Sequence, residues 1–303
     1  PAPCVPLGAK ASPGTEWHYG PITAANSCAD EWRTRWTAVA GTAQVAGLLD
    51  DLRDEAREDL NILPAISVDD LELAFRGIKK RTAARLDCLA PSDGAELPRD
   101  ALVELTSILN EVEHDMALPL QVNYNEMVAI PKPDGGTRMI ALIPLVVALL
   151  SRCRRWRLDE WDEGEASHWD AAVRGSSALR AAVQSAFFDE SASSLGIACA
   201  TAYLDVEKFY DSLHVPLLIQ RMQELHFPPL QLVMLMCGHL APRFISRSGC
   251  YSDVVIPTRS ILAGCTSSNS LARGYLYHLC RVLHSRLPGI RLRTFVDDLT
   301  LRA

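Results

Sequence analysis

Hydrophobic and polar residues recur with helical spacing over much of the first part of this chain. Residues 31–60 are predicted to be helical, with charged side chains facing away from one apolar stripe. That stripe consists of Leu48, Leu52, Ala56 and Leu60. A capping-box pattern from Ser67 to Asp70 predicts a second helix, and Pro98 opens a third. Residues 1–30 are rich in Pro and Gly and lack periodicity, so we expect them to be irregular.

Strand patterns dominate the rest of the chain. Two apolar runs around Asp134-Gly135-Gly136 predict a β-hairpin over residues 127–143. A further strand is predicted to end at Asp205 and to lead into a helix with Pro216 in its first turn. Residues 243–262 alternate as strands do, and a long helix is expected to start near Leu271. Residues 291–302 read as a final hairpin.

Basic side chains gather in two places before residue 160. Lys79 to Arg85 precede a turn-rich loop, and four arginines close the helix that follows the first hairpin. These four are Arg152, Arg154, Arg155 and Arg157. Cations stabilise a helix C-terminus, but they also bind phosphates, so a structural role and a role in template binding both stay open. Residues 159–170 are acidic and are expected to form an exposed connection.

Composition places the chain among globular proteins. Hydrophobic residues make up 48% and charged residues 22%, and no run of 18 apolar residues exists, so a membrane-spanning helix is not expected. The sequence begins Pro-Ala-Pro-Cys, with neither an initiator Met nor a signal pattern, so we expect a fragment of a longer protein. The nine cysteines are dispersed without a Cys-x-x-Cys pair, which favours reduced thiols in an intracellular protein and argues against structural zinc.

The net charge of −7 counts against a protein that binds nucleic acid, but its distribution weakens that objection. Residues 238–303 contain nine Arg and three Asp, whereas much of the acid lies between Asp50 and Asp59. Local basic surface near the C-terminal hairpin can therefore still bind phosphates.

Three aspartates stand where predicted strands end. Asp205 ends one strand, and Asp297 and Asp298 occupy the tip of the final hairpin. Alone, an Asp-Asp pair is typical of a surface turn. Adjacent carboxylates repel each other, however, and a fold that holds them together usually supplies a cation. A carboxylate beside such a pair makes a site for two divalent cations about 4 Å apart, which serves nucleotidyl transfer.

Several stretches resemble the motifs of reverse transcriptases. The first metal-binding motif corresponds to Tyr203-Leu204-Asp205 with Tyr210-Asp211-Ser212, and the second to Phe295-Val296-Asp297-Asp298. The hairpin run Ile130-Pro131-Lys132-Pro133 with Arg138 is similar to the family's fingers motif, although Met139 stands where the family usually has Pro. The resemblance is greatest to the non-LTR retrotransposon branch and runs from about residue 65 to the last residue.

The resemblance implies roles for individual residues in catalysis. Asp205 and Asp297, helped by the carbonyl of Val206, are expected to bind two Mg²⁺ ions, for which Mn²⁺ can substitute, and Asp298 is expected to support them. Tyr210 is expected to pack under the sugar and to exclude a 2′-hydroxyl. Asp211 is expected to cap the following helix rather than to bind metal.

Further residues are implied in nucleotide binding. Lys132 and, above all, Arg138 are expected to hold the triphosphate. Gly264 and Ser268 match the loop on which the nascent base pair rests. Ala263 and Asn269 depart from the family's usual Gln and Pro in this loop, which leaves nucleotide selectivity open.

The implied fold is α+β, a right-hand polymerase with fingers and an antiparallel palm sheet. Residues 1–65 would be an N-terminal extension, 66–190 the fingers and 191–303 the palm. Because the chain stops five residues after Asp298, the helical thumb is expected to be missing and processive synthesis to be weak. The implied partners are an RNA template, a DNA primer and deoxynucleoside triphosphates, with no membrane; protein partners are not indicated.

Two other interpretations stay open. The first is another palm polymerase, from a group II intron, a retron or an RNA-dependent RNA polymerase, although Tyr210 favours a DNA product. The second is a relic that binds nucleic acid without turnover. The intact set of three acids counts against the relic.

Overall fold

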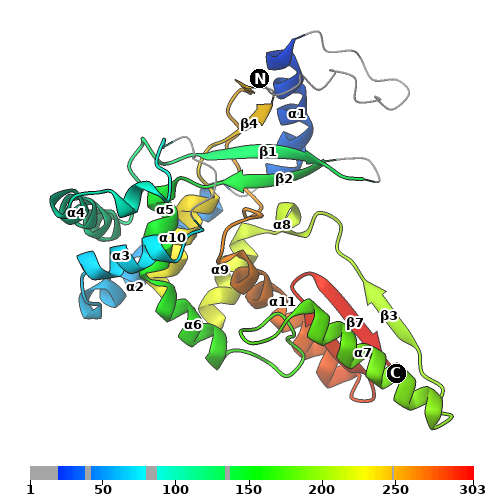
Figure 1. Cartoon of the computed structure of the whole chain (residues 1–303). Helices are drawn as coiled ribbons and strands as arrows, with labels where there is room; N and C mark the ends of the chain where they lie inside the picture. The colour runs from blue at the N-terminus through cyan, green and yellow to red at the C-terminus, as the bar shows by residue number, and fades with distance from the viewer. Residues whose placement is uncertain (1–19, 38–41, 80–86, 134–136, 248) are drawn as a thin grey trace.

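Helices and two β-sheets make up the chain in the computed structural model, so the predicted α+β class is confirmed (Figure 1). The structure describes residues 20–37, 42–79, 87–133, 137–247 and 249–303. Most of the basic run after Lys79 and the tip of the first hairpin therefore lie outside the described residues.

The first sheet contains the predicted hairpin and joins it to a distant part of the chain. Its strand order is β2-β1-β4-β5. The strands are β1 (Asn125–Pro131), β2 (Thr137–Leu142), β4 (Arg243–Arg247) and β5 (Cys250–Tyr251). Strands β1 and β2 are antiparallel, whereas β1 and β4 are parallel, with Asn125 opposite Arg243. The sequence predicted the hairpin but not this parallel pairing.

The second sheet has three strands in the order β3-β7-β6, and all its neighbours are antiparallel. They are β3 (Thr201–Leu204), β6 (Arg291–Phe295) and β7 (Asp298–Arg302). One face is apolar, with Leu292 and Leu299 buried in the main core. The other face is polar; there Arg293 and Arg302 donate hydrogen bonds to the helix spanning Ala178–Ser194.

Helices surround both sheets. In chain order they are α1 (Pro21–Trp36), α2 (Thr42–Ile62), α3 (Val68–Arg76), a 3₁₀ turn (Asp93–Ala95), α4 (Arg99–Asp115), α5 (Leu145–Cys153), α6 (Arg155–Gly164), α7 (Ala178–Ser194), α8 (Phe209–Ser212), α9 (Val215–Glu224), α10 (Pro229–His239) and α11 (Ser268–Arg286). The predicted capping box forms at α3, where Ser67 and Asp70 each accept a hydrogen bond from the other's backbone N–H. Within the described residues, no helix is long and apolar enough to cross a membrane.

Apolar side chains form three clusters. The largest lies under the second sheet and takes its residues mainly from α2, α6, α9, α10 and α11. A second joins α3 and α4 to α5, and a third packs Trp32 and Trp36 of α1 against the first sheet. Burial of these stripes, rather than local propensity, is what holds the helices in place.

Two predictions about irregular segments were wrong. Residues 21–30 belong to α1, because Pro21 fits the first turn of a helix and the buried face of α1 packs on the first sheet. Residues 159–164 belong to α6, and the segment is not an exposed connection, because Trp161 and Trp169 are both buried in the main core. The acidic composition of this segment gave no sign that the two tryptophans are buried.

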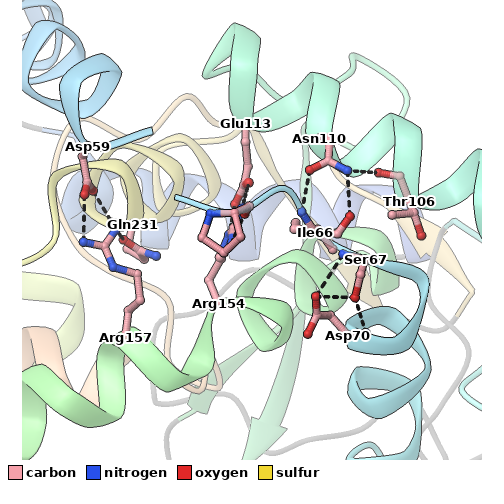
Figure 2. Close-up of polar contacts among 11 residues, drawn as sticks. Asp59, Ile66, Ser67, Asp70, Thr106, Asn110, Glu113, Arg154, Arg157 and Gln231 are labelled. Atoms are coloured by element: carbon pink, nitrogen blue, oxygen red, sulfur yellow. Dashed lines mark hydrogen bonds and ion pairs between the residues drawn. The ribbon is translucent and has the colours of Figure 1, made fainter. Parts of the chain in front are cut away.

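The arginines around residue 154 straddle two helices and are mostly paired (Figure 2). Arg154 is buried and donates to both carboxylate oxygens of Glu113 at 2.8 and 2.5 Å. Arg157 donates to both oxygens of Asp59 at 2.7 and 2.8 Å. Of the two roles left open, the structural one therefore applies to Arg154 and Arg157, whose charges are already neutralised inside the protein.

Candidate functional site

Three carboxylates meet where β3 and the β6–β7 hairpin end. The last pair of the β3–β7 ladder joins Leu204 to Leu299, so Asp205 follows directly beside Asp298. The β6–β7 ladder closes with Phe295 opposite Asp298, which leaves Val296 and Asp297 as the two turn residues. The predicted hairpin, with its acids at the tip, is confirmed.

The turn that presents Asp297 is strained. Val296 has φ +60°, a left-handed conformation that β-branched residues rarely adopt. Glycine would fit this position better, so packing and pairing of the two strands must hold Val296 there. Strain of this kind is typical of functional turns, and here it fixes the backbone on which Asp297 stands.

The three acids share one electrostatic environment. The pKa of Asp298 is raised, first by desolvation and then by the negative charges of Asp297 and Asp205. Both neighbours therefore lie near enough to repel Asp298 in its charged form. A cation placed among them would relieve this repulsion.

The donor set suits a hard cation that brings some of its own ligands. Among the described residues, no group of three or more His, Cys, Asp and Glu side chains converges closely enough to hold a metal by itself. Mg²⁺ commonly binds through one or two carboxylates together with substrate phosphates, rather than in a complete protein cage. Asp205, Asp297 and the carbonyl of Val206 fit that pattern.

Tyr210 lies beside the acids on the short helix α8. Its pKa is raised to about 12, first by burial and then by the negative charge of Asp297. The ring packs edge-on against Phe209, and the hydroxyl donates to Oδ1 of Asn269 at 2.9 Å. The sequence predicted the place of Tyr210 but gave no sign of its contact with Asn269.

A lysine connects this region to the first hairpin. Nζ of Lys208 donates to the backbone oxygen of Thr137 at 2.8 Å, and the same group lies 4.7 Å from the ring centre of Trp32. Thr137 begins β2 next to Arg138, which is exposed, so the bond keeps Arg138 close to the segment that follows Asp205. Lys132 is also exposed, just beyond the end of β1.

The loop from Leu262 to Ser268 adopts a shape that depends on Gly264. Gly264 has φ +107°, and an added Cβ would lie 3.3 Å from the backbone oxygen of Ala141. The N–H of Ala141 donates to the oxygen of Ala263, so the loop is joined to β2. Ser268 is buried and its hydroxyl donates to the oxygen of Leu262. Its side chain therefore shapes the loop from inside, and a contact between Ser268 and nucleotide stays a prediction.

Two cavities flank this loop. One of about 270 Å³ is lined by Gly264, Thr266, Arg152 and His239. The other, of about 740 Å³, is lined by Thr266 and Asn269 together with charged side chains of α6 and α11. Several of these charges are paired, as in the contact of 2.6 Å between Arg273 and Asp162. The larger cavity gives open space next to the contact between Tyr210 and Asn269.

Asp211 differs from its prediction. It does not cap the following helix, since His214 is the N-cap of α9. Instead its Oδ1 accepts a hydrogen bond of 2.8 Å from Nε1 of Trp36 on α1. The backbone oxygen of Trp36 also accepts bonds from Thr258 and Arg259. A contact across 175 residues has no local sequence signal, so Trp36 was missed as a supporting residue.

Comparison with known families agrees with this geometry. A family model described as reverse transcriptase (RNA-dependent DNA polymerase) matches residues 130–303. The match covers more than half of the chain and includes all three acids, Tyr210 and the loop at Gly264. No curated protein sequence matches the chain.

Proposed function

The chain belongs to the reverse transcriptase family, and on that basis we propose that it catalyses RNA-directed DNA synthesis with Asp205 and Asp297 as its essential acids. The observation that carries the proposal is the meeting of Asp205, Asp297 and Asp298 at one end of the antiparallel sheet, inside the matched region. Family membership supports the general activity. The geometry supports the assignment of residues.

The proposed reaction extends a DNA primer. The 3′-hydroxyl of the primer gives up its proton to solvent as its oxygen forms a bond to the α-phosphorus of a deoxynucleoside triphosphate, and pyrophosphate leaves with the electrons of the bond that breaks. Asp205, Asp297 and the carbonyl of Val206 would hold two Mg²⁺ ions, and Asp298 would add negative charge beside them. When bound, such ions lower the pKa of the attacking hydroxyl and neutralise charge on the leaving group. Mn²⁺ would substitute.

Arg138 and Lys132 are proposed to bind the triphosphate. Both are exposed on the first hairpin, and the bond from Lys208 to Thr137 holds the base of β2 near the acids. Arginine suits this task because its fork-shaped guanidinium can donate two hydrogen bonds to phosphate oxygens. Lys132 would act as a second, more mobile cation.

Tyr210 and Gly264 are proposed to shape the nucleotide site. The ring of Tyr210 would exclude a 2′-hydroxyl and so favour deoxynucleotides. Gly264 would provide the surface under the nascent base pair, with its backbone conformation fixed by contact with β2. Ser268 would contribute by supporting this loop.

We place the chain within the non-LTR retrotransposon branch, with residues 66–190 as fingers and 191–303 as palm. The residues that make up the motifs around Asp205, Asp297 and Arg138 support this placement. So does the helical segment before the first hairpin, which packs against the later part of the chain.

Primer extension on an RNA template annealed to a DNA primer, with Mg²⁺, tests the proposal. Wild-type protein is expected to add deoxynucleotides, even if only one or two. Asp297→Asn should abolish addition, because it removes one negative oxygen ligand. Asp51→Asn makes the same chemical change at an exposed site on α2 and should leave addition intact.

The other outcomes separate the alternatives. Efficient incorporation of ribonucleotides would point to an RNA polymerase and overturn the role of Tyr210. Binding of primer–template without incorporation would favour a non-catalytic relic. Equal activity in wild type and Asp297→Asn would refute the assignment of the acids.

A further inference from the structure

The hydroxyl of Tyr210 is held by a side chain of another helix. In the structure it donates to the amide oxygen of Asn269 at 2.9 Å. Without Asn269 the hydroxyl would lose this acceptor, and the ring would no longer be held from its outer end.

Asn269 is well placed to hold the hydroxyl in one position. It lies in the first turn of α11 between two buried serines. Ser268 donates to the oxygen of Leu262, and Ser270 donates to Oδ2 of Asp162 at 2.8 Å. Because both neighbours are fixed, the backbone of Asn269 is fixed too. Its exposed side chain reaches across to α8 and lines the larger cavity.

The other end of Tyr210 is already anchored. Its backbone oxygen accepts a bond from the N–H of Ile261, and its ring packs edge-on against Phe209. These contacts fix the backbone of Tyr210 and one side of its ring. The position of the hydroxyl depends on its hydrogen bond to Asn269. The ring plane, which would meet the sugar, therefore depends on a residue of another helix.

We propose that Asn269 is a positioning residue for sugar selection: its amide oxygen holds the ring of Tyr210 where it blocks a ribose. This inference rests on the proposed function, because it assumes that a nucleoside triphosphate binds beside Tyr210. It adds to that function a second residue that sets the choice between deoxyribose and ribose.

The test compares kcat/KM for one deoxynucleotide with kcat/KM for the matching ribonucleotide. Asn269→Ala removes the acceptor, and the preference for deoxynucleotide should fall roughly three- to tenfold, as expected for one hydrogen bond. Asn269→Asp keeps an oxygen acceptor and should retain the preference. Its extra charge affects both substrates alike, so it cancels in the ratio.

Tyr210→Phe removes the same hydrogen bond from the other side. It should lower the preference to a similar extent, and Tyr210→Phe with Asn269→Ala should lower it no further than either change alone. This non-additivity distinguishes positioning through Tyr210 from a separate effect of Asn269 on the loop.

The other results decide against the positioning role of Asn269, alone or together with the polymerase function. If wild type extends the primer but Asn269→Ala keeps the wild-type ratio, the positioning role is wrong and the polymerase function stands. Additive effects, or a loss in Asn269→Asp equal to that in Asn269→Ala, also overturn the positioning role. No extension by the wild type overturns the polymerase function and this inference together.

Discussion

His239 is a single buried residue on which the loop at Gly264 depends. Its Nδ1 accepts a hydrogen bond of 2.9 Å from the N–H of Leu262, and its own oxygen accepts a bond from Arg243. Burial first, and then the positive charge of Arg243, lower the pKa of His239 from 6.5 to about 3. The imidazole is therefore neutral in the folded protein over the whole neutral range.

This shift predicts a loss of stability in acid. Below pH 6.5 the unfolded chain binds a proton at His239, whereas the folded chain does not until near pH 3. The stabilisation is thus complete above pH 6.5 and declines as pH falls toward 3. Between pH 7 and pH 4.5 it should decline by about 2–3 kcal/mol.

Urea unfolding at several pH values would measure this decline. Other groups also titrate, so the comparison is with His239→Asn, whose amide oxygen can still accept from Leu262 but which cannot be protonated. The difference in unfolding free energy between the two proteins should change in favour of the variant as pH falls. A constant difference across this range would contradict a neutral buried His239.

Arg154 and Glu113 provide a second test at the residue scale. Both are buried and form a two-point ion pair, so Arg154→Ala leaves an unpaired carboxylate in the interior. This change should lower the unfolding free energy by about 3–5 kcal/mol. The double variant Arg154→Met with Glu113→Leu should restore most of that free energy. Urea unfolding measures both effects.

The same double variant tests whether Arg154 binds the template. If the pair is purely structural, primer–template affinity should equal that of the wild type at every salt concentration. If Arg154 contacts a phosphate, affinity should fall and the slope against log salt should decrease by about one. The second result would reverse the assignment drawn from the structure.

At this scale the positions of the candidate site residues could be predicted from the sequence better than their hydrogen-bond partners. Asp205, Asp297 and Tyr210 could be found because each stands at a fixed place relative to a strand end or a turn. Ser268 and Asp211 were assigned from local position alone, and both use their polar atoms inside the protein. Only the packed fold shows which polar atom is already satisfied.

At the scale of elements, α1 supports the segment around Tyr210 from outside the matched region. Trp36 donates to the half-buried carboxylate of Asp211, next to Tyr210, and burial raises the pKa of Asp211 while this bond lowers it. Nε1 of Trp32, one turn earlier, has no hydrogen-bond partner among the described residues. The two tryptophans form a natural matched pair.

Trp36→Phe should therefore be more harmful than Trp32→Phe. Both changes remove similar volume from one cluster, but only the first leaves a half-buried carboxylate oxygen without its donor. The difference in unfolding free energy should be about 1–3 kcal/mol, measured by urea unfolding. Primer extension should also fall more in Trp36→Phe. Equal effects of the two changes would argue against support of α8 by α1.

Helices and strands with a clear pattern in the sequence were predicted well, but the elements with which they pair or pack were not. The capping box at Ser67, the first hairpin and the final hairpin all follow from short-range patterns. Helix α10 was not predicted, although most of its side chains are buried, because a run apolar on every side has no helical stripe to recognise. The parallel pairing of β1 with β4 joins residues more than 100 apart and has no local signal.

At the scale of the molecule, the negative charge and the candidate site belong to different elements. The exposed face of α2 carries Asp50, Asp51, Asp54, Glu55 and Glu58, while its buried face packs Leu52 and Ala56 in the main core. The overall charge of −7 therefore arises largely from a helix that serves packing, away in sequence from the acids of the site. A negative net charge is compatible with nucleic-acid binding at the C-terminal hairpin.

The three apolar clusters also predict that the chain unfolds as one unit. The first sheet has the order β2-β1-β4, and most of β1 precedes residue 130, where the family match begins. A fragment of residues 130–303 would lose most of the strand that joins β2 to β4. It would also lose the buried side chains that α1, α2, α3 and α4 contribute to the three clusters.

Such a fragment should show no cooperative transition in urea, whereas the full chain should unfold in a single transition seen alike by tryptophan fluorescence and circular dichroism. The physical reason is that a domain must bury its own core to be stable, and here the core of the matched region is completed by the residues before it. A fragment that unfolds cooperatively near the midpoint of the full chain would show that the matched region forms a core of its own.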